Sequence, residues 1–209
     1  MQFPVHTFPQ DTASYIAPTW ADLNDLAFAV AGQVLASSWQ PDRVVTLAKG
    51  GWAMTRSLVD YLGVEHVASI GVKFYRGINE QLSKPEIYQE IPVSIAGESL
   101  LLFDDVADTG HSLVFVKELL LRQGAKEVRT ATLFYKPHSV LKTDYFAAQT
   151  SAWIVFQYEC IETARMLVPK WREQGVTEQV VVARLQELGF TEEMYEHYTK
   201  LVQLLPQSL

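Results

Sequence analysis

The sequence of 209 residues contains one cysteine, Cys160, so it cannot form an internal disulfide bond. No Cys/His cluster has the spacing of a zinc site, and we therefore expect a reducing compartment and no structural metal. The sequence also lacks an apolar run of the roughly 20 residues needed to span a bilayer. Residues 1–10 lack the basic and apolar regions of a signal peptide. These absences predict a soluble, cytoplasmic protein that does not interact with membranes.

Positive charge is scarce: the sequence has 17 Lys and Arg residues and 24 Asp and Glu residues, which gives a net charge of −7. Such a surface repels a nucleic-acid backbone on average, so we expect no nucleic-acid partner, although a small anionic ligand in a local pocket is compatible with it. A hydrophobic fraction of 48% excludes a wholly disordered chain. The length fits one sizeable core with an appendage.

Apolar periodicity predicts strands that alternate with helices. The predicted strands are 43–48, 67–75, 99–103, 127–135 and 153–158. The predicted helices are 19–39, a stretch after Gly51 that ends at Gly63, and a helix with Leu113 to Leu120 on its buried face that ends at Gly124. This order predicts an α/β fold, with a mainly parallel twisted sheet, helices on both of its faces, and ligands beyond the carboxyl ends of the strands. We expect a core over residues 1–162 with a flexible loop at about 74–91, and a helical C-terminal extension over 163–209.

The loop after the central strand carries the strongest chemical signal, with the sequence DDVADTGHS over residues 104–112. Two adjacent carboxylates, Asp104 and Asp105, suit a ribose diol and a hydrated magnesium ion. The hydroxyls of Thr109 and Ser112 and the N–H groups at a helix start suit a phosphate. The alternative is that Asp108 or Thr109 only caps the helix and the paired acids are solvated. Neither a dinucleotide-binding fingerprint nor a Walker A loop is present.

Residues 101–112, LLFDDVADTGHS, resemble the phosphoribosyl pyrophosphate (PRPP) signature of the type I phosphoribosyltransferases. Ser112 departs from the commoner Thr but keeps the hydroxyl. The resemblance implies that Asp104 and Asp105 face the ribose hydroxyls and Mg²⁺, and that Asp108 is the acid/base near N7 of a purine. It also implies that the 5′-phosphate is bound by Asp108, Thr109, Gly110, His111 and Ser112.

An earlier strand ends at Lys49-Gly50-Gly51, where this family has its pyrophosphate-binding loop. The two glycines let the backbone approach an anion closely, and Lys49 supplies positive charge. The resemblance implies PRPP binding by Lys49 and Gly50, and a non-proline cis peptide bond near Ala48–Lys49. The alternative is an ordinary turn with a solvated lysine.

Two later segments, FYKP over 134–137 and WIVFQYE over 153–159, resemble the xanthine-guanine type of 6-oxopurine phosphoribosyltransferase. The resemblance implies that Lys136 contacts O6 of the base, that Trp153 stacks on it, and that the backbone of Ile154 reads its far edge. A cationic donor selects a carbonyl over an amino group, which favours hypoxanthine, guanine or xanthine over adenine. Alternatively, Lys136 is a solvated strand end and Trp153 a core aromatic. The FQYE segment departs from the family's commoner ending.

We therefore predict a magnesium-dependent purine phosphoribosyltransferase of nucleotide salvage, whose loop over about 74–91 closes on the active site. Its substrates are PRPP and a purine base, and its products are a nucleoside monophosphate and pyrophosphate. Dimers are usual in the family, which implies a homodimer or higher homo-oligomer. Two alternatives stay open: a phosphoribosyltransferase for another base, and a non-catalytic regulator that senses PRPP or a nucleotide.

Overall fold

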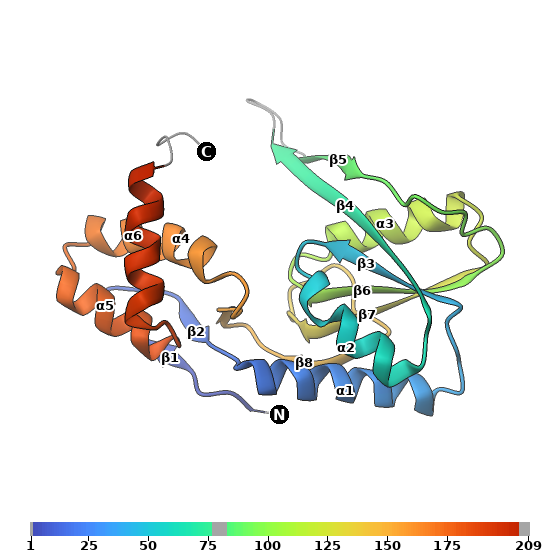
Figure 1. The fold of residues 1–209 in the computed structure, drawn as a ribbon, viewed down its shortest axis with the longest axis horizontal. Coiled ribbons are helices and arrows are strands. Elements are labelled where there is room, and N and C mark those ends of the chain that lie inside the picture. The colour runs from blue at the N-terminus through green and yellow to red at the C-terminus, as the bar shows by residue number, and fades with distance from the viewer. Residues whose placement is uncertain (1, 77–82, 205–209) are drawn as a thin grey trace. The chain divides into compact units, whose positions relative to one another are not determined.

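The structure is a computed structural model that describes residues 2–76 and 83–204 (Figure 1). Its strands are β1 (His6–Thr7), β2 (Ser14–Ile16), β3 (Arg43–Ala48), β4 (His66–Arg76), β5 (Ser83–Gln89), β6 (Ser99–Ala107), β7 (Glu127–Tyr135), β8 (Tyr145–Gln149) and β9 (Trp153–Ile154). Its helices are α1 (Trp20–Ala36), α2 (Trp52–Leu62), α3 (His111–Arg122), α4 (Cys160–Glu173), α5 (Glu178–Glu187) and α6 (Glu192–Leu204). Within the described ranges, no helix is both long and apolar enough to cross a membrane.

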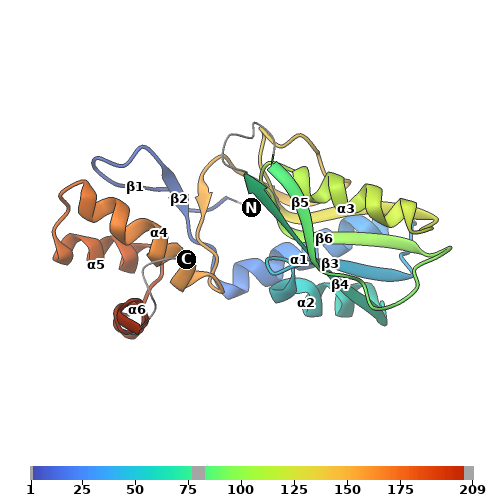
Figure 2. The same cartoon turned by 90° about the horizontal axis from the view of Figure 1, so that it is seen from above.

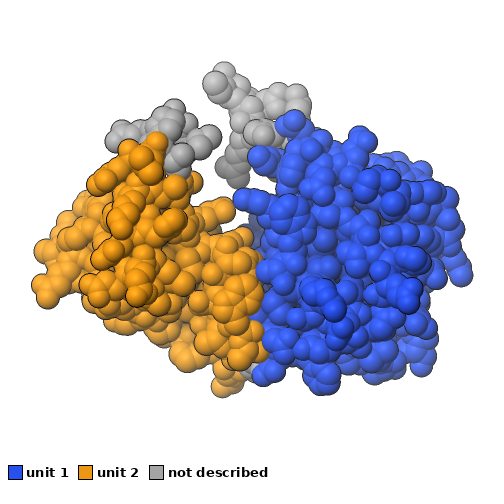
Figure 3. All heavy atoms as spheres, viewed as in Figure 1, with its two compact units in different colours: residues 1, 23–151 blue, residues 2–22, 152–209 orange. Residues whose placement is uncertain are grey.

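The chain divides into two compact units (Figure 3). Unit 1 contains residues 23–151 together with residue 1, and unit 2 contains residues 2–22 and 152–209. The predicted boundary after residue 162 falls within α4, and the N-terminal segment belongs to the same unit as the C-terminal helices. The units therefore do not follow the order of the chain, because its first residues pack with its last.

Unit 1 is built on a six-stranded sheet with the order β5-β4-β3-β6-β7-β8. Neighbouring strands run parallel except β5, which is antiparallel to β4. Helix α3 covers one face of this sheet and α2 the other (Figure 2). The predicted α/β class, with a mainly parallel sheet between helices, is confirmed.

The central strands are apolar along their length because helices cover both faces of the sheet. Residues 100–103 of β6 are fully buried, and Leu113, Val116 and Leu120 of α3 join the core on one face. Because β3, β6 and β7 run parallel, their carboxyl ends meet at one edge of the sheet. The polar loops that follow these three strands emerge there.

One strand prediction is wrong, and one strand was missed. Residues 153–158 do not form a long strand: β9 covers only Trp153–Ile154 and pairs with β2 in the small sheet of unit 2. The sixth strand of the large sheet is instead β8, which was not predicted. Its sequence, YFAAQ, is too short and too rich in alanine for a clear alternation of apolar and polar residues.

The stretch around residues 74–91, predicted as a flexible loop, contains an antiparallel pair of strands in its described part. Strands β4 and β5 pair from Gly71↔Gln89 to Arg76↔Ser83. The tip of the predicted loop, residues 77–82, lies outside the described residues. Closure of this loop therefore stays a prediction.

Unit 2 combines the small sheet β1-β2-β9 with the three C-terminal helices, whose presence is confirmed. Trp171 of α4 is fully buried in its core. Asp11, from the N-terminal segment, accepts hydrogen bonds from Tyr15 Oη (2.6 Å), Lys170 Nζ (2.7 Å) and Trp171 Nε1 (2.8 Å). Burial alone would raise the pKa of Asp11, but these bonds outweigh it and hold that pKa well below its usual range. Asp11 thus fastens the N-terminal segment to α4.

We expect Asp11→Asn to lower the free energy of unfolding by roughly 3 kcal/mol, because it leaves the Lys170 ammonium without its buried counter-charge. Because folding lowers the pKa of Asp11, this stabilisation is present above about pH 4 and is lost as the pH falls further. Urea unfolding followed by circular dichroism measures both effects. Asp60→Asn is the matched control, since its ion pair with Arg56 is exposed. Equal stability of the two variants would contradict this role for Asp11.

Candidate active site

The loop that follows β3, residues 48–51, is named here the Lys49 loop. Its Ala48–Lys49 peptide bond is cis, so the non-proline cis bond implied by the family resemblance is confirmed. Gly51 N donates to Leu47 O (3.0 Å), and a Cβ at Gly51 would lie 2.9 Å from the carbonyl oxygen of Phe103. Only glycine fits this close approach. The Lys49 side chain is exposed at the edge of the sheet.

The two adjacent carboxylates lie within β6 rather than after it. Asp105 is 6% exposed, which excludes the alternative of a solvated acid at this position. Its carboxylate packs against the Lys49 loop so closely that a Cβ at Gly50 would lie 2.6 Å and 2.7 Å from its two oxygens. Asp104 Oδ1 accepts a hydrogen bond from the backbone N–H of Asp105 (3.0 Å). The Lys49 loop therefore packs directly against the carboxyl-terminal part of β6.

The residues after β6 lead into the amino end of α3. Gly110 is the N-cap residue, with φ +81°, and no side chain caps the helix. The alternative that Asp108 or Thr109 serves as the cap is therefore excluded. Asp108, Thr109 and His111 are exposed. The first N–H groups of α3 are available to an anion here, since a helix does not use them for its own hydrogen bonds.

The loop that follows β7, residues 136–141, lies against the loop after β6. Lys136 N donates to Ala107 O (3.1 Å), and Val140 N donates to Thr109 O (3.0 Å). A Cβ at Gly110 would collide with the hydroxyl of Ser139. The two loops are thus held in one arrangement by backbone bonds and a close contact.

Lys136 is 6% exposed, so it is not a solvated strand end. Burial lowers the pKa of Lys136, and the negative charge of Asp108 opposes this shift. The same loop places His138 Nε2 3.3 Å from Asp108 Oδ1. His138 was not among the predicted site residues, and its one signal in the sequence is its position two residues after Lys136.

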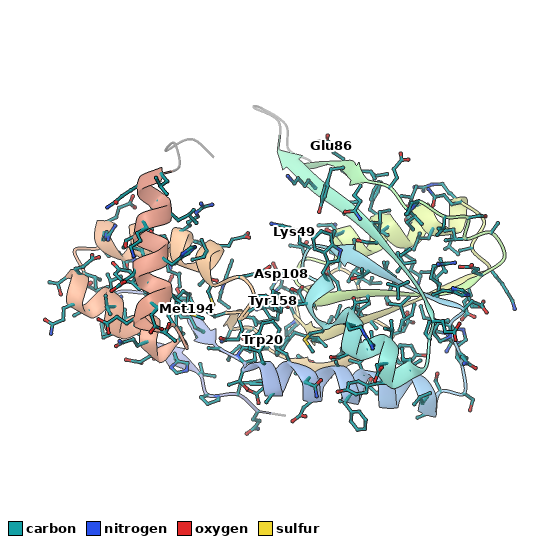
Figure 4. All side chains as sticks on the ribbon, viewed as in Figure 1. Trp20, Lys49, Glu86, Asp108, Tyr158 and Met194 are labelled. Carbon is teal, nitrogen blue, oxygen red and sulfur yellow. The ribbon has the colours of Figure 1, made fainter. Side chains whose placement is uncertain are left out.

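Unit 1 thus brings most of the predicted site residues to one edge of its sheet, where Figure 4 labels Lys49 and Asp108. These residues are Lys49, Gly50, Asp104, Asp105, Asp108, Thr109, Gly110, His111, Ser112 and Lys136. The arrangement offers exposed cationic and helix N–H groups for an anion beside buried carboxylate oxygens for hydroxyls or a divalent cation.

A family model described as "Phosphoribosyl transferase domain" matches residues 19–163. The chain belongs to this family. The chain is 25% identical over 160 residues to the xanthine-guanine phosphoribosyltransferase of Gluconobacter oxydans, an alignment that covers 76% of this chain and 90% of that protein. It is 24% identical over 146 residues to the uracil phosphoribosyltransferase of Clostridioides difficile, covering 70% of this chain and 65% of that protein.

Solved phosphoribosyltransferase structures agree with this assignment. The purine phosphoribosyltransferase of Pyrococcus horikoshii is 33% identical, with a TM-score of 0.62 over 69% of this chain and 93% of that chain. The xanthine-guanine-hypoxanthine phosphoribosyltransferase of Helicobacter pylori, 23% identical, shares the fold with a TM-score of 0.58 over 70% of this chain and 93% of that chain. The part of this phosphoribosyltransferase that the family model matches ends at residue 163, within the first turn of α4.

The other two predicted base contacts of this phosphoribosyl transferase domain, Trp153 and Ile154, lie in unit 2. Trp153 is 47% exposed, which excludes the alternative of a core aromatic. Its strand β9 is held by pairing with Tyr15 and Ile16 of β2. Ile154 is buried, so its side chain belongs to the packing of unit 2.

Proposed function

We propose that this protein transfers ribose 5-phosphate from PRPP to a 6-oxopurine base and releases pyrophosphate, as an enzyme of purine salvage. The observation that carries the proposal is the packing of the Lys49 loop against Asp105 at the sheet edge from which α3 also begins. One edge thus offers groups for a pyrophosphate, a ribose and a 5′-phosphate. The relatives named for xanthine, guanine and other purines support the choice of base.

The groups of PRPP fit this edge in order. The 5′-phosphate is bound by the amino end of α3 with the hydroxyls of Thr109 and Ser112, because a helix N-terminus favours an anion. The ribose hydroxyls face Asp104 and Asp105. The pyrophosphate lies on the Lys49 loop, whose lysine and backbone stabilise it as it departs.

Magnesium fits the donor set but would need ligands from the substrate. Among residues 2–76 and 83–204, no group of three or more His, Cys, Asp or Glu side chains could hold a metal ion. Asp104 and Asp105 supply hard oxygen ligands, and Mg²⁺ usually takes one or two carboxylates and completes its shell with water and phosphate oxygens. When bound, the ion would neutralise developing charge on the pyrophosphate. Removal of Mg²⁺ by a chelator is expected to stop turnover.

The reaction exchanges the bond between C1′ and pyrophosphate for a bond between C1′ and N9 of the base. Positive charge develops on the ribose ring as pyrophosphate leaves, and the carboxylates of Asp104 and Asp105 face that charge. Asp108 accepts the proton that N7 of the base loses. Its contact with His138 engages Oδ1 of this carboxylate.

Selection of the base rests on Lys136 of unit 1, which donates to O6. We expect Lys136→Gln to lower kcat/KM for hypoxanthine roughly 10- to 100-fold, the usual loss for a hydrogen bond from a charged donor. Because burial lowers the pKa of Lys136, rising pH removes its charge, and kcat/KM of the wild type should fall at alkaline pH. The Gln variant should lack that alkaline decline.

Lys142→Gln is the matched control for Lys136→Gln. Lys142 belongs to the same connection between β7 and β8, but it is exposed and its ammonium lies over the ring of Phe146. Its steady-state kinetics with hypoxanthine and PRPP should equal those of the wild type. An alkaline decline that persists in Lys136→Gln would contradict the role of Lys136.

A panel of bases tests the proposed function. Hypoxanthine, guanine, xanthine, adenine, uracil and orotate are each incubated with PRPP and Mg²⁺, and pyrophosphate release is followed. Release with the 6-oxopurines supports the proposal, and release only with uracil, orotate or adenine supports another base, uracil being the substrate named for one relative. PRPP binding without release with any base would support a regulatory protein.

We further propose that the enzyme works in the cytoplasm and as a homodimer or higher homo-oligomer. The single buried cysteine, Cys160, supports a reducing compartment. Sedimentation velocity of the purified protein tests the assembly, and a monomer at micromolar concentration would contradict it.

A further inference from the structure

Tyr88 of β5 connects the edge of the sheet to the Lys49 loop. Its hydroxyl donates a hydrogen bond to the carbonyl oxygen of Ala48 (3.1 Å). Strands β5 and β3 are not neighbours, because β4 lies between them. In the sheet register, the β4 residue beside Ala48 is Gly71. The Tyr88 side chain therefore crosses β4 at Gly71 to reach the loop.

Gly71 leaves the space through which the ring passes. A Cβ at this position would collide with the ring and lie 2.8 Å from its hydroxyl oxygen. Gly71 does not have a positive φ, so its backbone conformation does not require glycine. A glycine inside a strand weakens the sheet, and it is expected where another group approaches the backbone closely. Here the approaching group is the Tyr88 ring.

Lys73 provides a second contact with the same ring. Its ammonium lies 5.2 Å from the ring centroid, in the geometry of a cation–π interaction. Alternate residues of a strand share a face, so Gly71 and Lys73 lie on the same face of β4. The Tyr88 ring packs against Gly71, and the Lys73 ammonium lies near the ring. Tyr88 is 43% exposed, so specific contacts rather than burial in a core hold it in place.

We propose that Tyr88 is a positioning residue that holds the Lys49 loop in its pyrophosphate-binding form and connects that loop to strand β5. The carbonyl that Tyr88 binds belongs to the peptide group whose nitrogen is Lys49 N. Because a peptide group is planar, holding this oxygen also sets the direction of the Lys49 N–H. The inference rests on the proposed role of the loop in binding pyrophosphate.

The test compares ligands that do and do not contain the pyrophosphate group. Tyr88→Phe should raise the Kd of PRPP and of inorganic pyrophosphate, each with Mg²⁺, roughly 3- to 10-fold, the range of one lost hydrogen bond. The Kd of a purine nucleoside monophosphate should stay within about twofold, because that product lacks the group bound by the loop. Isothermal titration calorimetry measures all three without turnover.

A second variant reaches the same contact from the other side. Gly71→Ala should displace the Tyr88 ring and raise the Kd of PRPP and of pyrophosphate as Tyr88→Phe does. Tyr88→Phe should then have a smaller effect in the Gly71→Ala background than in the wild type, because the contact is already lost. Tyr61→Phe is the matched control, since it removes the hydroxyl that donates to Asn24 Oδ1 (2.7 Å). It should leave all three Kd values unchanged.

The outcomes separate this inference from the proposed function. Suppose that the wild type binds PRPP and pyrophosphate. If Tyr88→Phe leaves both Kd values unchanged, or raises the Kd of the nucleoside monophosphate equally, the positioning role is wrong and the proposed function stands. If the wild type binds neither PRPP nor pyrophosphate, the proposed function is wrong and this inference falls with it. Should Gly71→Ala fail to fold, the conservative Tyr88→Phe still decides.

Discussion

Asp108→Asn is expected to lower kcat roughly 10²- to 10⁴-fold, the range for loss of a general acid/base, while the Kd of PRPP stays nearly constant. Asparagine has the shape of aspartate but cannot accept the N7 proton. Asp108 is exposed at the end of β6 and contacts His138, so the substitution removes no core packing. Steady-state kinetics and calorimetric PRPP binding measure the two effects separately.

The control for Asp108→Asn is Asp25→Asn, on the exposed face of α1. This variant makes the same chemical change away from the sheet edge and should keep wild-type kcat. Equal losses of kcat and of PRPP affinity in Asp108→Asn would contradict the acid/base assignment, because they would show that Asp108 only binds PRPP.

Gly50→Ala is expected to lower kcat/KM for PRPP by at least roughly 10²-fold, the cost of misplacing reacting groups by about 1 Å. The new Cβ would lie 2.6 Å from a carboxylate oxygen of Asp105, which is buried in a closely packed interior. Either this carboxylate or the Lys49 loop must shift, and the proposal needs both in place. Kinetics over a range of PRPP and Mg²⁺ concentrations measure the loss.

Gly32→Ala is the matched control for Gly50→Ala. A Cβ at Gly32, within α1, would meet no atom within 4 Å, and alanine favours a helix more than glycine does. This variant should be as active as the wild type and slightly more stable. Wild-type kcat/KM in Gly50→Ala would show that the contact between the Lys49 loop and Asp105 has no role in the reaction.

The sequence predicts the parts of the fold that depend on local pattern. The buried run of β6 and the motif over 104–112 indicated a strand, a loop and a helix start, and the structure has all three. The resemblance to the family also implied the Ala48–Lys49 cis bond, which is present. Strand β8 was missed because alanine carries little periodic signal, and β9 is short because its chain pairs with β2 instead of the large sheet.

Contacts between distant segments could not be predicted from local pattern. The approach of Asp105 to Gly50 depends on how β3 and β6 pair. The hydrogen bond from Tyr88 to Ala48 depends on the register of β4, which lies between β3 and β5. His138 carries no motif of its own, and it lies beside Asp108 because the loops after β6 and β7 are held together. Each of these residues gains its neighbours through tertiary pairing.

Mass spectrometry of the reaction product decides whether the protein transfers ribose 5-phosphate to a purine. The wild-type protein is incubated with PRPP, Mg²⁺ and hypoxanthine, guanine or xanthine, with Asp108→Asn as the background. We expect the nucleoside monophosphate of the added base, formed in a one-to-one ratio with pyrophosphate, and a greatly reduced yield in the variant. Absence of a nucleotide with all three bases, in protein that is folded and binds PRPP, would contradict the proposed function.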